Sequence, residues 1–215
     1  MRLWTVQRPE VYETLKAKGV YHCDHNILLA KRDPDAYNDI TDAYAWMAKQ
    51  MLHRIGNPPS GVVFPIWAWH TWDCQHKRPD MRRLGFNCFL FGGDKVLMEI
   101  EIPDEQVLLS DKVLWDYVLC KDYCGDHDVE LSEDKFDEAW EKQNNWLNSL
   151  TEAQRTEVIE KSWEKVFDVF PLRKSDYYTT LDIQATFWEL KLDQVVMTWH
   201  FKGRTCPADF NFEQD

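Results

Sequence analysis

Alternating hydrophobic and polar positions recur along the chain and predict short strands. Leu3 to Gln7 alternates and is rich in β-forming residues, as is the segment 194–201. In the segment 96–102 one side carries Val96, Met98, Ile100 and Ile102, whereas Glu99 and Glu101 fall on the other. That strand should pack one face on a core and leave the other face in water. Further strands are expected at 20–22, 62–69, 86–91, 107–109 and 183–190, with a hairpin at 92–94.

Helical periodicity predicts the remaining elements. One helix begins at Pro9 and ends at Gly19, and another covers 35–55, where apolar residues recur every three or four positions. Ser110 is expected to cap a helix that continues to about Leu119. Two helices then form a hairpin over 131–170, and a capping box at 151–154 opens the second. The expected buried stripe of the first helix is Phe136, Trp140, Gln143, Leu147 and Leu150.

This order of elements predicts an α+β fold with a mixed, mainly antiparallel sheet and flanking helices. We expect one domain over 1–215, with the helical hairpin at 131–170 inserted into it. Repeated βαβ units, a GxGxxG motif and a GxxxxGK[ST] loop are all missing from the sequence. A Rossmann or P-loop enzyme is therefore disfavoured.

The composition of the chain limits the classes of molecule that it is expected to bind and the compartment in which it is expected to work. The 215 residues carry a net charge of −12, which disfavours unspecific binding to nucleic acid or anionic membranes. No segment approaches the roughly 20 apolar residues of a membrane span, and the amino-terminal segment does not resemble a secretory signal. The six cysteines are scattered, so we expect free thiols and a cytoplasmic protein.

The segment from Gly61 to Gly85 holds the most unusual local chemistry. It joins an aromatic half, predicted to be a strand, to a basic loop in an otherwise acidic chain. Tryptophans there would stack on a planar ring, while the cations would bind a nucleotide or small anionic ligand. The alternative is a core strand followed by a solvated loop in which Asp80 pairs with an arginine. The candidate binding residues are Trp67, Trp69, Trp72, Lys77, Asp80, Arg82 and Arg83.

Gln184 and Glu189, in the late segment IQATFWELK, are the candidate catalytic residues. Glu189 falls on the apolar face of the predicted strand, so it is either a solvated carboxylate in a turn or a partly buried functional acid. The His and Cys residues near 22–25 and 120–127 include zinc-ligand types, but their spacing matches no paired metal motif. We therefore expect no metal site.

Four motifs resemble a bacterial and phage-borne family of domains of unknown function. They are LWTVQ, PIWAW with KRPDMR, EIPDEQVLLSD, and IQATFWELKLDQVV, and they run from Arg2 to about Phe201. The resemblance implies a cytoplasmic protein of about this length, but no activity.

At the level of fold, the chain also resembles compact ADP-ribosyltransferase-like domains, in which a groove between two small sheets holds NAD. The resemblance implies that Gln184 or Glu189 orients the ribose and stabilises the oxocarbenium-like transition state. It implies contacts from the first strand, Trp4 to Gln7, and stacking of nicotinamide on Trp67, Trp69 or Trp72. The chain departs from the usual pattern, because no His or Arg is central in LWTVQ.

Three functions are compatible with these features. The first is an ADP-ribosyltransferase-like domain that binds NAD as substrate and transfers ADP-ribose to a macromolecular acceptor. The second is a non-catalytic module that binds a nucleotide or protein through the aromatic and basic groove. The third is an acidic protein of phage–host conflict, which would exploit the charge of −12.

Overall fold

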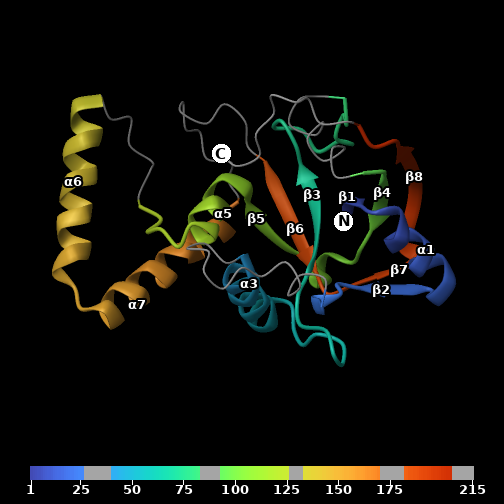
Figure 1. Ribbon diagram of the computed structural model, residues 1–215, viewed down its shortest axis with the longest axis horizontal. Coiled ribbons are helices and arrows are strands. Elements are labelled where there is room, and N and C mark those ends of the chain that lie inside the picture. Colours follow the sequence, from blue (N-terminus) through green and yellow to red (C-terminus); the bar gives the residue numbers. More distant parts are fainter. Residues whose placement is uncertain (27–39, 83–92, 126–132, 170–181, 205–215) are drawn as a thin grey trace.

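A computed structural model of the chain describes residues 1–26, 40–82, 93–125, 133–169 and 182–204 (Figure 1). The helices are α1 (Pro9–Lys18), α3 (Ile40–Arg54), α5 (Lys112–Leu119), α6 (Glu133–Ser149) and α7 (Glu152–Ser162). The strands are β1 (Arg2–Gln7), β2 (Val20–His22), β3 (Ile66–Thr71), β4 (Lys95–Glu101), β5 (Leu108–Asp111), β6 (Ile183–Phe187), β7 (Glu189–Lys191) and β8 (Val195–Phe201). Short 3₁₀ turns lie at Asp104–Gln106, Trp163–Phe167 and Leu192–Gln194.

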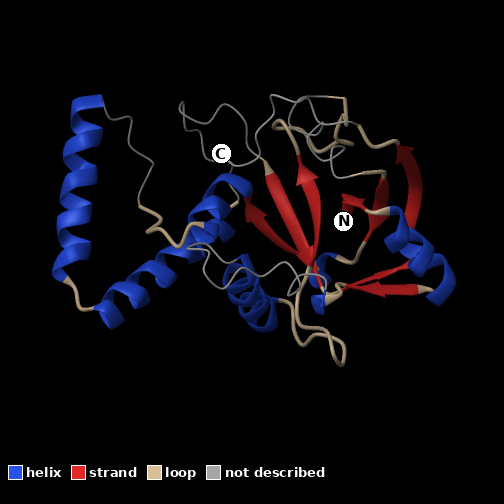
Figure 2. Ribbon diagram, viewed as in Figure 1, coloured by secondary structure: helices blue, strands red, loops and turns tan. Residues whose placement is uncertain are grey.

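A six-stranded sheet in the order β5-β6-β3-β1-β4-β8 forms the centre of the molecule, and β2 pairs with β7 in a second, smaller sheet. All strand pairings among the described residues are antiparallel. Helices α3 and α5 lie beside the β5–β6 end of the large sheet, and α1 lies near β4 and β8 (Figure 2). The predicted α+β class is confirmed.

The two faces of the large sheet bury different cores. One face packs Leu3, Met98 and Phe187 against Leu15 of α1, and all four side chains are essentially inaccessible to solvent. The opposite face packs against α3 and α5 at the β5–β6 end, through residues such as Met47. At the β1–β4 end, a small cluster that includes Trp4 and Leu97 covers the same opposite face. We call this opposite face the helix face.

Several predicted elements occur as expected. α1 begins at Pro9 and ends at Gly19, whose φ of 75° and whose N–H donated to the Leu15 carbonyl (2.8 Å) form a left-handed cap. The capping box at Thr151 and Gln154 opens α7. In β4 the side chains at 96, 98 and 100 are buried in one core, as the alternation predicts. The prediction that the other face of this strand lies in water is wrong, because Leu97 on that face is fully buried beside Trp4.

Other predictions need correction. β3 begins only after Pro65, at Ile66, because Pro65 lacks the N–H that a central strand donates. The predicted strand 183–190 divides at Trp188 into β6 and β7, which belong to different sheets. Trp188 donates its indole N–H to the Gly56 carbonyl (3.0 Å) and lies in the helix-side core, so the chain turns there.

The helix predicted from 35 begins in the described chain at Ile40, since 27–39 lie outside the described residues. The predicted strand 86–91 also lies outside them.

β4 pairs with β1 on one side and β8 on the other, and β5 is an edge strand beside β6.

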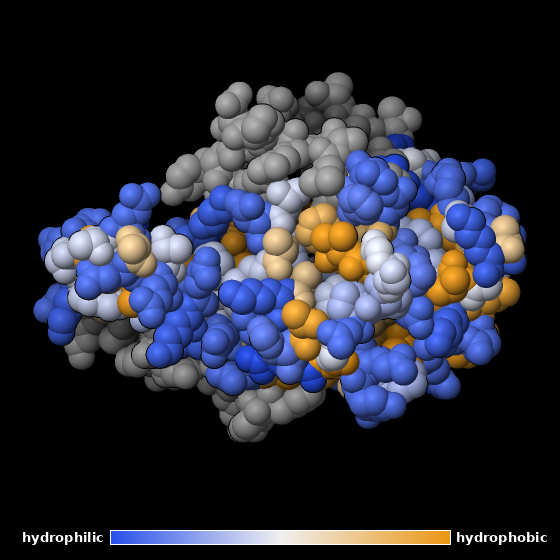
Figure 3. Space-filling view, turned by 90° about the horizontal axis from the view of Figure 1, so that it is seen from below, coloured by the Kyte–Doolittle hydropathy of each residue, from blue (hydrophilic) through white to orange (hydrophobic). Residues whose placement is uncertain are grey.

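Helix α6 stands away from the sheets at one end of the molecule, and α7 leads from it back toward α5 (Figure 1). Leu147 is buried, but Trp140 is 59% exposed, so the prediction that Trp140 belongs to a buried stripe is wrong. From below, apolar surface gathers over the body and these two helices are largely hydrophilic (Figure 3).

Candidate functional site

A row of three side chains crosses the helix face of the large sheet. Gln184 of β6 lies directly opposite Trp69 of β3 on one side and Ser110 of β5 on the other. Trp67 lies one step along β3 on the same face, because residues two apart in a strand share a face. The alternate residues of β6, such as Ala185, point into the other core. Gln184 and the predicted tryptophans Trp67 and Trp69 are therefore neighbours in space.

Three polar atoms in this group are buried and have no hydrogen-bond partner in the described part of the chain. They are Trp67 Nε1, Ser110 Oγ and Gln184 Oε1. A buried polar group without a partner costs about 1–3 kcal/mol of stability. Three on neighbouring strands of one face are unusual, since nearly all buried polar groups in native proteins are paired. Each of these atoms would gain a hydrogen-bond partner from a ligand that reached this face.

Aromatic rings surround this polar group. Trp67 contacts Tyr44 of α3 and Trp115 of α5, with ring centroids 5.4 Å and 4.8 Å apart. Burial raises the pKa of Tyr44 to about 12, so its hydroxyl keeps its proton at neutral pH. Trp69 meets the edge of Trp72 at 4.7 Å. Trp67, Trp69 and Gln184 are only partly buried, so this face is not fully sealed by the core.

We call the rings of Tyr44, Trp67, Trp69, Trp72 and Trp115 the aromatic wall. The local sequence explains why α5 carries part of it. Asp111 caps α5, and its carboxylate accepts hydrogen bonds from the backbone N–H groups of Val113 and Leu114. The prediction that Ser110 is the cap is wrong by one residue. Ser110 is the third residue of β5 and lies opposite Gln184 in the sheet, which leaves Asp111 at the extended cap position.

The basic loop folds back over the helix face beside Trp69. A tight turn at Asp73 and Cys74, both with positive φ, reverses the chain, and the backbone N–H of Asp73 donates to Asp182 Oδ1 (2.7 Å). Met81 is buried against Trp4 and Leu97. Hence the loop is anchored at Asp73 next to the start of β6 and at Met81 on β1 and β4.

The cations of this loop are not assembled into a clamp among the described residues. Arg82 is 84% exposed and makes a paired contact with Asp80, at 2.9 Å and 2.8 Å. Arg78 stacks over Trp199 at 4.4 Å, and Lys77 is exposed. The alternative in which Asp80 pairs with an arginine is therefore what the structure shows. Arg83 lies outside the described residues.

The two candidate residues of the first strand, Trp4 and Gln7, lie on opposite faces of the large sheet. Trp4 lies on the helix face, opposite Glu99, where its ring meets His76 edge-on at 5.2 Å. Gln7 lies on the other face and donates to Thr5 Oγ1 (2.8 Å). Gln7 is thus not part of the group around Gln184, because one strand sends alternate side chains to opposite faces.

Glu189 is also separate from Gln184. It lies in β7 of the small sheet, where its carboxylate meets His22 Nε2 (3.2 Å) and Lys191 Nζ (3.1 Å). Burial opposes ionisation of Glu189, but hydrogen bonds from Lys191 and His22 outweigh it and lower its pKa. Glu189 is an ionised, paired carboxylate, and the two predicted catalytic residues do not form one site.

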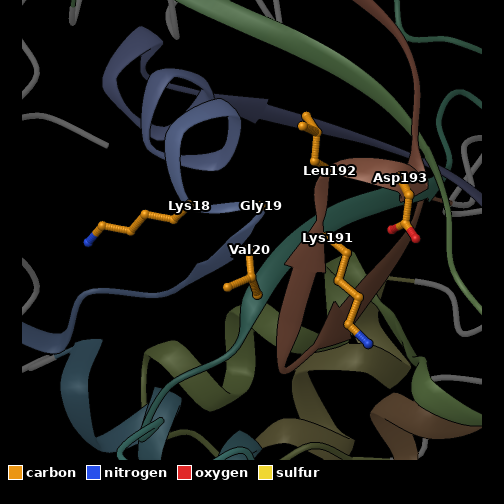
Figure 4. Close-up of a pocket in the computed structure, with 6 residues that line it drawn as sticks. All are labelled: Lys18, Gly19, Val20, Lys191, Leu192 and Asp193. Atoms are coloured by element: carbon orange, nitrogen blue, oxygen red, sulfur yellow. The ribbon is translucent and has the colours of Figure 1, made fainter.

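Two further observations bear on ligand binding. In the described ranges, no group of three or more His, Cys, Asp or Glu side chains is placed to hold a metal ion. A shallow depression of about 590 Å³ lies between Gly19 and Leu192. Its two lysines, Lys18 and Lys191, extend in different directions, so they do not converge on one anion (Figure 4).

Comparison with known proteins identifies the family. A family model described as Domain of unknown function (DUF3841) matches residues 2–196. The chain belongs to this family. No curated protein and no solved structure matches it significantly. Within the described ranges, none of the helices is long and apolar enough to span a membrane.

Sequence reasoning did not identify Ser110 and Tyr44 as members of this group. Ser110 carried a capping signal that Asp111 satisfies, and Tyr44 belonged to an ordinary amphipathic stripe. Both join the group only through the pairing of β5 with β6 and the packing of α3 on Trp67. Nothing in the local sequence pattern marks either contact.

Proposed function

We propose that this chain binds NAD or a related nucleotide on the helix face around Gln184 and transfers ADP-ribose to a macromolecular acceptor. The observation that supports it is the position of Gln184 directly opposite Trp69, with Trp67 on the same face. The late Gln and the aromatic wall were linked in sequence only through the likeness to ADP-ribosyltransferase-like domains. Their side-by-side placement is independent support for a shared site.

The residues favour a particular division of work. Trp67 and Trp69 offer planar surfaces for stacking, worth about 1–3 kcal/mol for each stacked base. Gln184 is neutral, so it orients a bound group through hydrogen bonds and supplies no charge to a cationic transition state. Glu189 takes no part, because it is paired in the other sheet. We place this chemistry in the cytoplasm, because the scattered cysteines favour a compartment in which thiols stay free.

The proposed transfer balances without a redox partner. The bond between ribose C1′ and nicotinamide N1 breaks, and its electron pair goes to N1, which leaves as neutral nicotinamide. A lone pair of an oxygen or nitrogen atom on the acceptor forms the new bond to C1′. The proton of that acceptor group passes to water.

Labelled NAD tests the proposal directly. NAD with a labelled adenylate is incubated with the whole chain and with protein, DNA or RNA acceptors, and nicotinamide release and label transfer are measured. Gln184→Leu should abolish both, and Gln143→Leu, at a half-exposed position of α6, is the matched control. Failure of millimolar NAD to raise the melting temperature, together with no turnover, would exclude the proposal.

A non-catalytic nucleotide-binding module is the second candidate. The neutrality of Gln184, Ser110 and Trp67 favours it, because none of these groups is a charged acid or base. In the same assay this function predicts a rise in melting temperature with NAD, but no release of nicotinamide. The two functions therefore give different results in one experiment.

A further inference from the structure

The buried polar atoms on the helix face have complementary hydrogen-bonding roles. Trp67 Nε1 can only donate, Gln184 Oε1 can only accept, and the Ser110 hydroxyl can do either. A ligand that satisfies the first two must present an acceptor and a donor close together. A primary carboxamide does so, since its C=O accepts and its NH₂ donates.

The strand register places these groups within reach of one ligand. Trp67 lies opposite Thr186, and Gln184 lies two residues before Thr186 on the same face. Trp67 and Gln184 are therefore diagonal neighbours, whose backbones lie roughly 7–8 Å apart in such a sheet. Long side chains at that spacing can hold a small planar group between them. Ser110 lies directly opposite Gln184 on the far side.

We propose, resting on the proposed function, that Trp67 and Gln184 together recognise the carboxamide of the nicotinamide ring. Trp67 Nε1–H donates to the carboxamide oxygen, and Gln184 Oε1 accepts from its NH₂. The Ser110 hydroxyl completes the polar floor. Trp67, Tyr44 and Trp69 of the aromatic wall cover the ring, so Gln184 meets the nicotinamide end of the dinucleotide and not its ribose.

This arrangement selects an amide against the corresponding acid. Nicotinic acid adenine dinucleotide carries a carboxylate, which has no N–H and meets the lone pairs of Gln184 Oε1. The three recognising groups are neutral, so none of them compensates a buried negative charge. Sites built to hydrogen-bond a substrate group reject analogues that lack it by large factors. We expect NAD to bind roughly 100-fold more tightly than the acid analogue.

Calorimetric titration of the whole chain with NAD, its nicotinic acid analogue and ADP-ribose tests this inference. Trp67→Phe keeps an aromatic ring but removes the donor, and Gln184→Leu removes the acceptor. Each should reduce NAD affinity at least about tenfold and shrink the preference for amide over acid. Trp140→Phe, at an exposed site on α6, is the control and should bind like the wild type.

The outcomes separate this inference from the function on which it rests. A strong preference for NAD that both variants lose supports the carboxamide site. Equal binding of NAD and the acid analogue overturns the carboxamide site and leaves the nucleotide-binding function standing. Binding of none of the three ligands overturns both. Melting curves of the two variants show whether either has lost its fold. If one variant does not fold, the binding data of the other decide whether the carboxamide site stands.

Discussion

Trp67 differs from Trp163 and Trp188 in what its indole N–H contacts. Trp163 donates to the Asp122 carbonyl (2.7 Å) and Trp188 to the Gly56 carbonyl (3.0 Å), whereas Trp67 Nε1 has no partner in the described chain. Folding thus leaves the indole N–H of Trp67 unsatisfied, at a position diagonal to Gln184 on the same face. A residue selected only for core packing would not need that N–H.

Replacing Trp67 by Phe should therefore leave the free energy of unfolding unchanged or raise it by about 1 kcal/mol, because an unsatisfied buried donor is removed. Trp163→Phe should lower it by about 1–2 kcal/mol, since it breaks a hydrogen bond and leaves a carbonyl unpaired. Urea unfolding of both variants measures the contrast. A larger loss for Trp67→Phe than for Trp163→Phe would show that Trp67 is purely structural.

His70 gives the fold a dependence on pH. Burial, with a smaller effect of neighbouring His76, lowers its pKa from 6.5 to about 4, although Asp104 opposes this. The unfolded chain therefore binds a proton near pH 6.5 that the folded chain does not bind until about pH 4. The stability that this shift in the pKa of His70 contributes to the fold is present above pH 6.5, and it is lost as the pH falls toward 4.

Replacing His70 by Asn should flatten the fall in unfolding free energy between pH 6.5 and 4. Asn does not titrate, and it can still contact the Thr71 hydroxyl that meets His70 Nδ1 at 2.8 Å. Unfolding curves at several pH values measure the slope. His53→Gln, at an exposed position of α3, shows what the loss of any imidazole does. An unchanged slope in His70→Asn would contradict the assignment.

At the scale of elements, α5 connects strand β5 to the aromatic wall. Its first turn is fixed by Asp111, and its buried face brings Trp115 onto Trp67. The orientation of Trp67, and hence of its N–H, depends on a helix of only eight residues. Such a short helix is stable only with a good cap and tertiary packing.

Asp111→Ala should lower the unfolding free energy by about 1–2 kcal/mol, because two backbone N–H groups lose their acceptor. It should also weaken nucleotide binding by loosening Trp115. Ser110→Ala is the adjacent control and should not destabilise the fold, since its Oγ accepts no hydrogen bond from the helix. Chemical denaturation distinguishes the two, and the reverse order would restore Ser110 as the cap.

At the scale of the whole molecule, the helical pair α6–α7 is largely separate from the site. Leu147 of α6 is buried, whereas Trp140 on the same helix is 59% exposed. The indole of Trp146 meets Tyr123 at 5.4 Å, which holds the carboxyl-terminal half of α6 near the body. Stability and ligand binding should therefore respond differently to changes along this one helix.

Leu147→Ala should lower the unfolding free energy by about 2–5 kcal/mol, as for other buried leucines. Trp140→Ala should change it by no more than about 0.5 kcal/mol, because an exposed side chain loses little on truncation. Neither should alter NAD affinity. A stability loss in Trp140→Ala comparable to that of Leu147→Ala would mean that another part of the chain covers Trp140.

The sequence by itself determined most local elements of this protein. Alternation and helical periodicity, together with Pro9, Gly19 and the capping box at Thr151, are encoded within a few residues and act on the adjacent backbone. They predicted α1, β1, β4 and α7, and the shared face of Trp67 and Trp69.

Only the tertiary structure decided which of these elements became neighbours. The pairing of β6 with β3 and β5 brought Gln184 between Trp69 and Ser110, and the turn at Trp188 sent Glu189 to the other sheet. Side-chain period fixes the face of a strand but not its partner, because pairing depends on contacts between segments distant in sequence. For that physical reason the composition of the candidate site could not be predicted from local pattern alone.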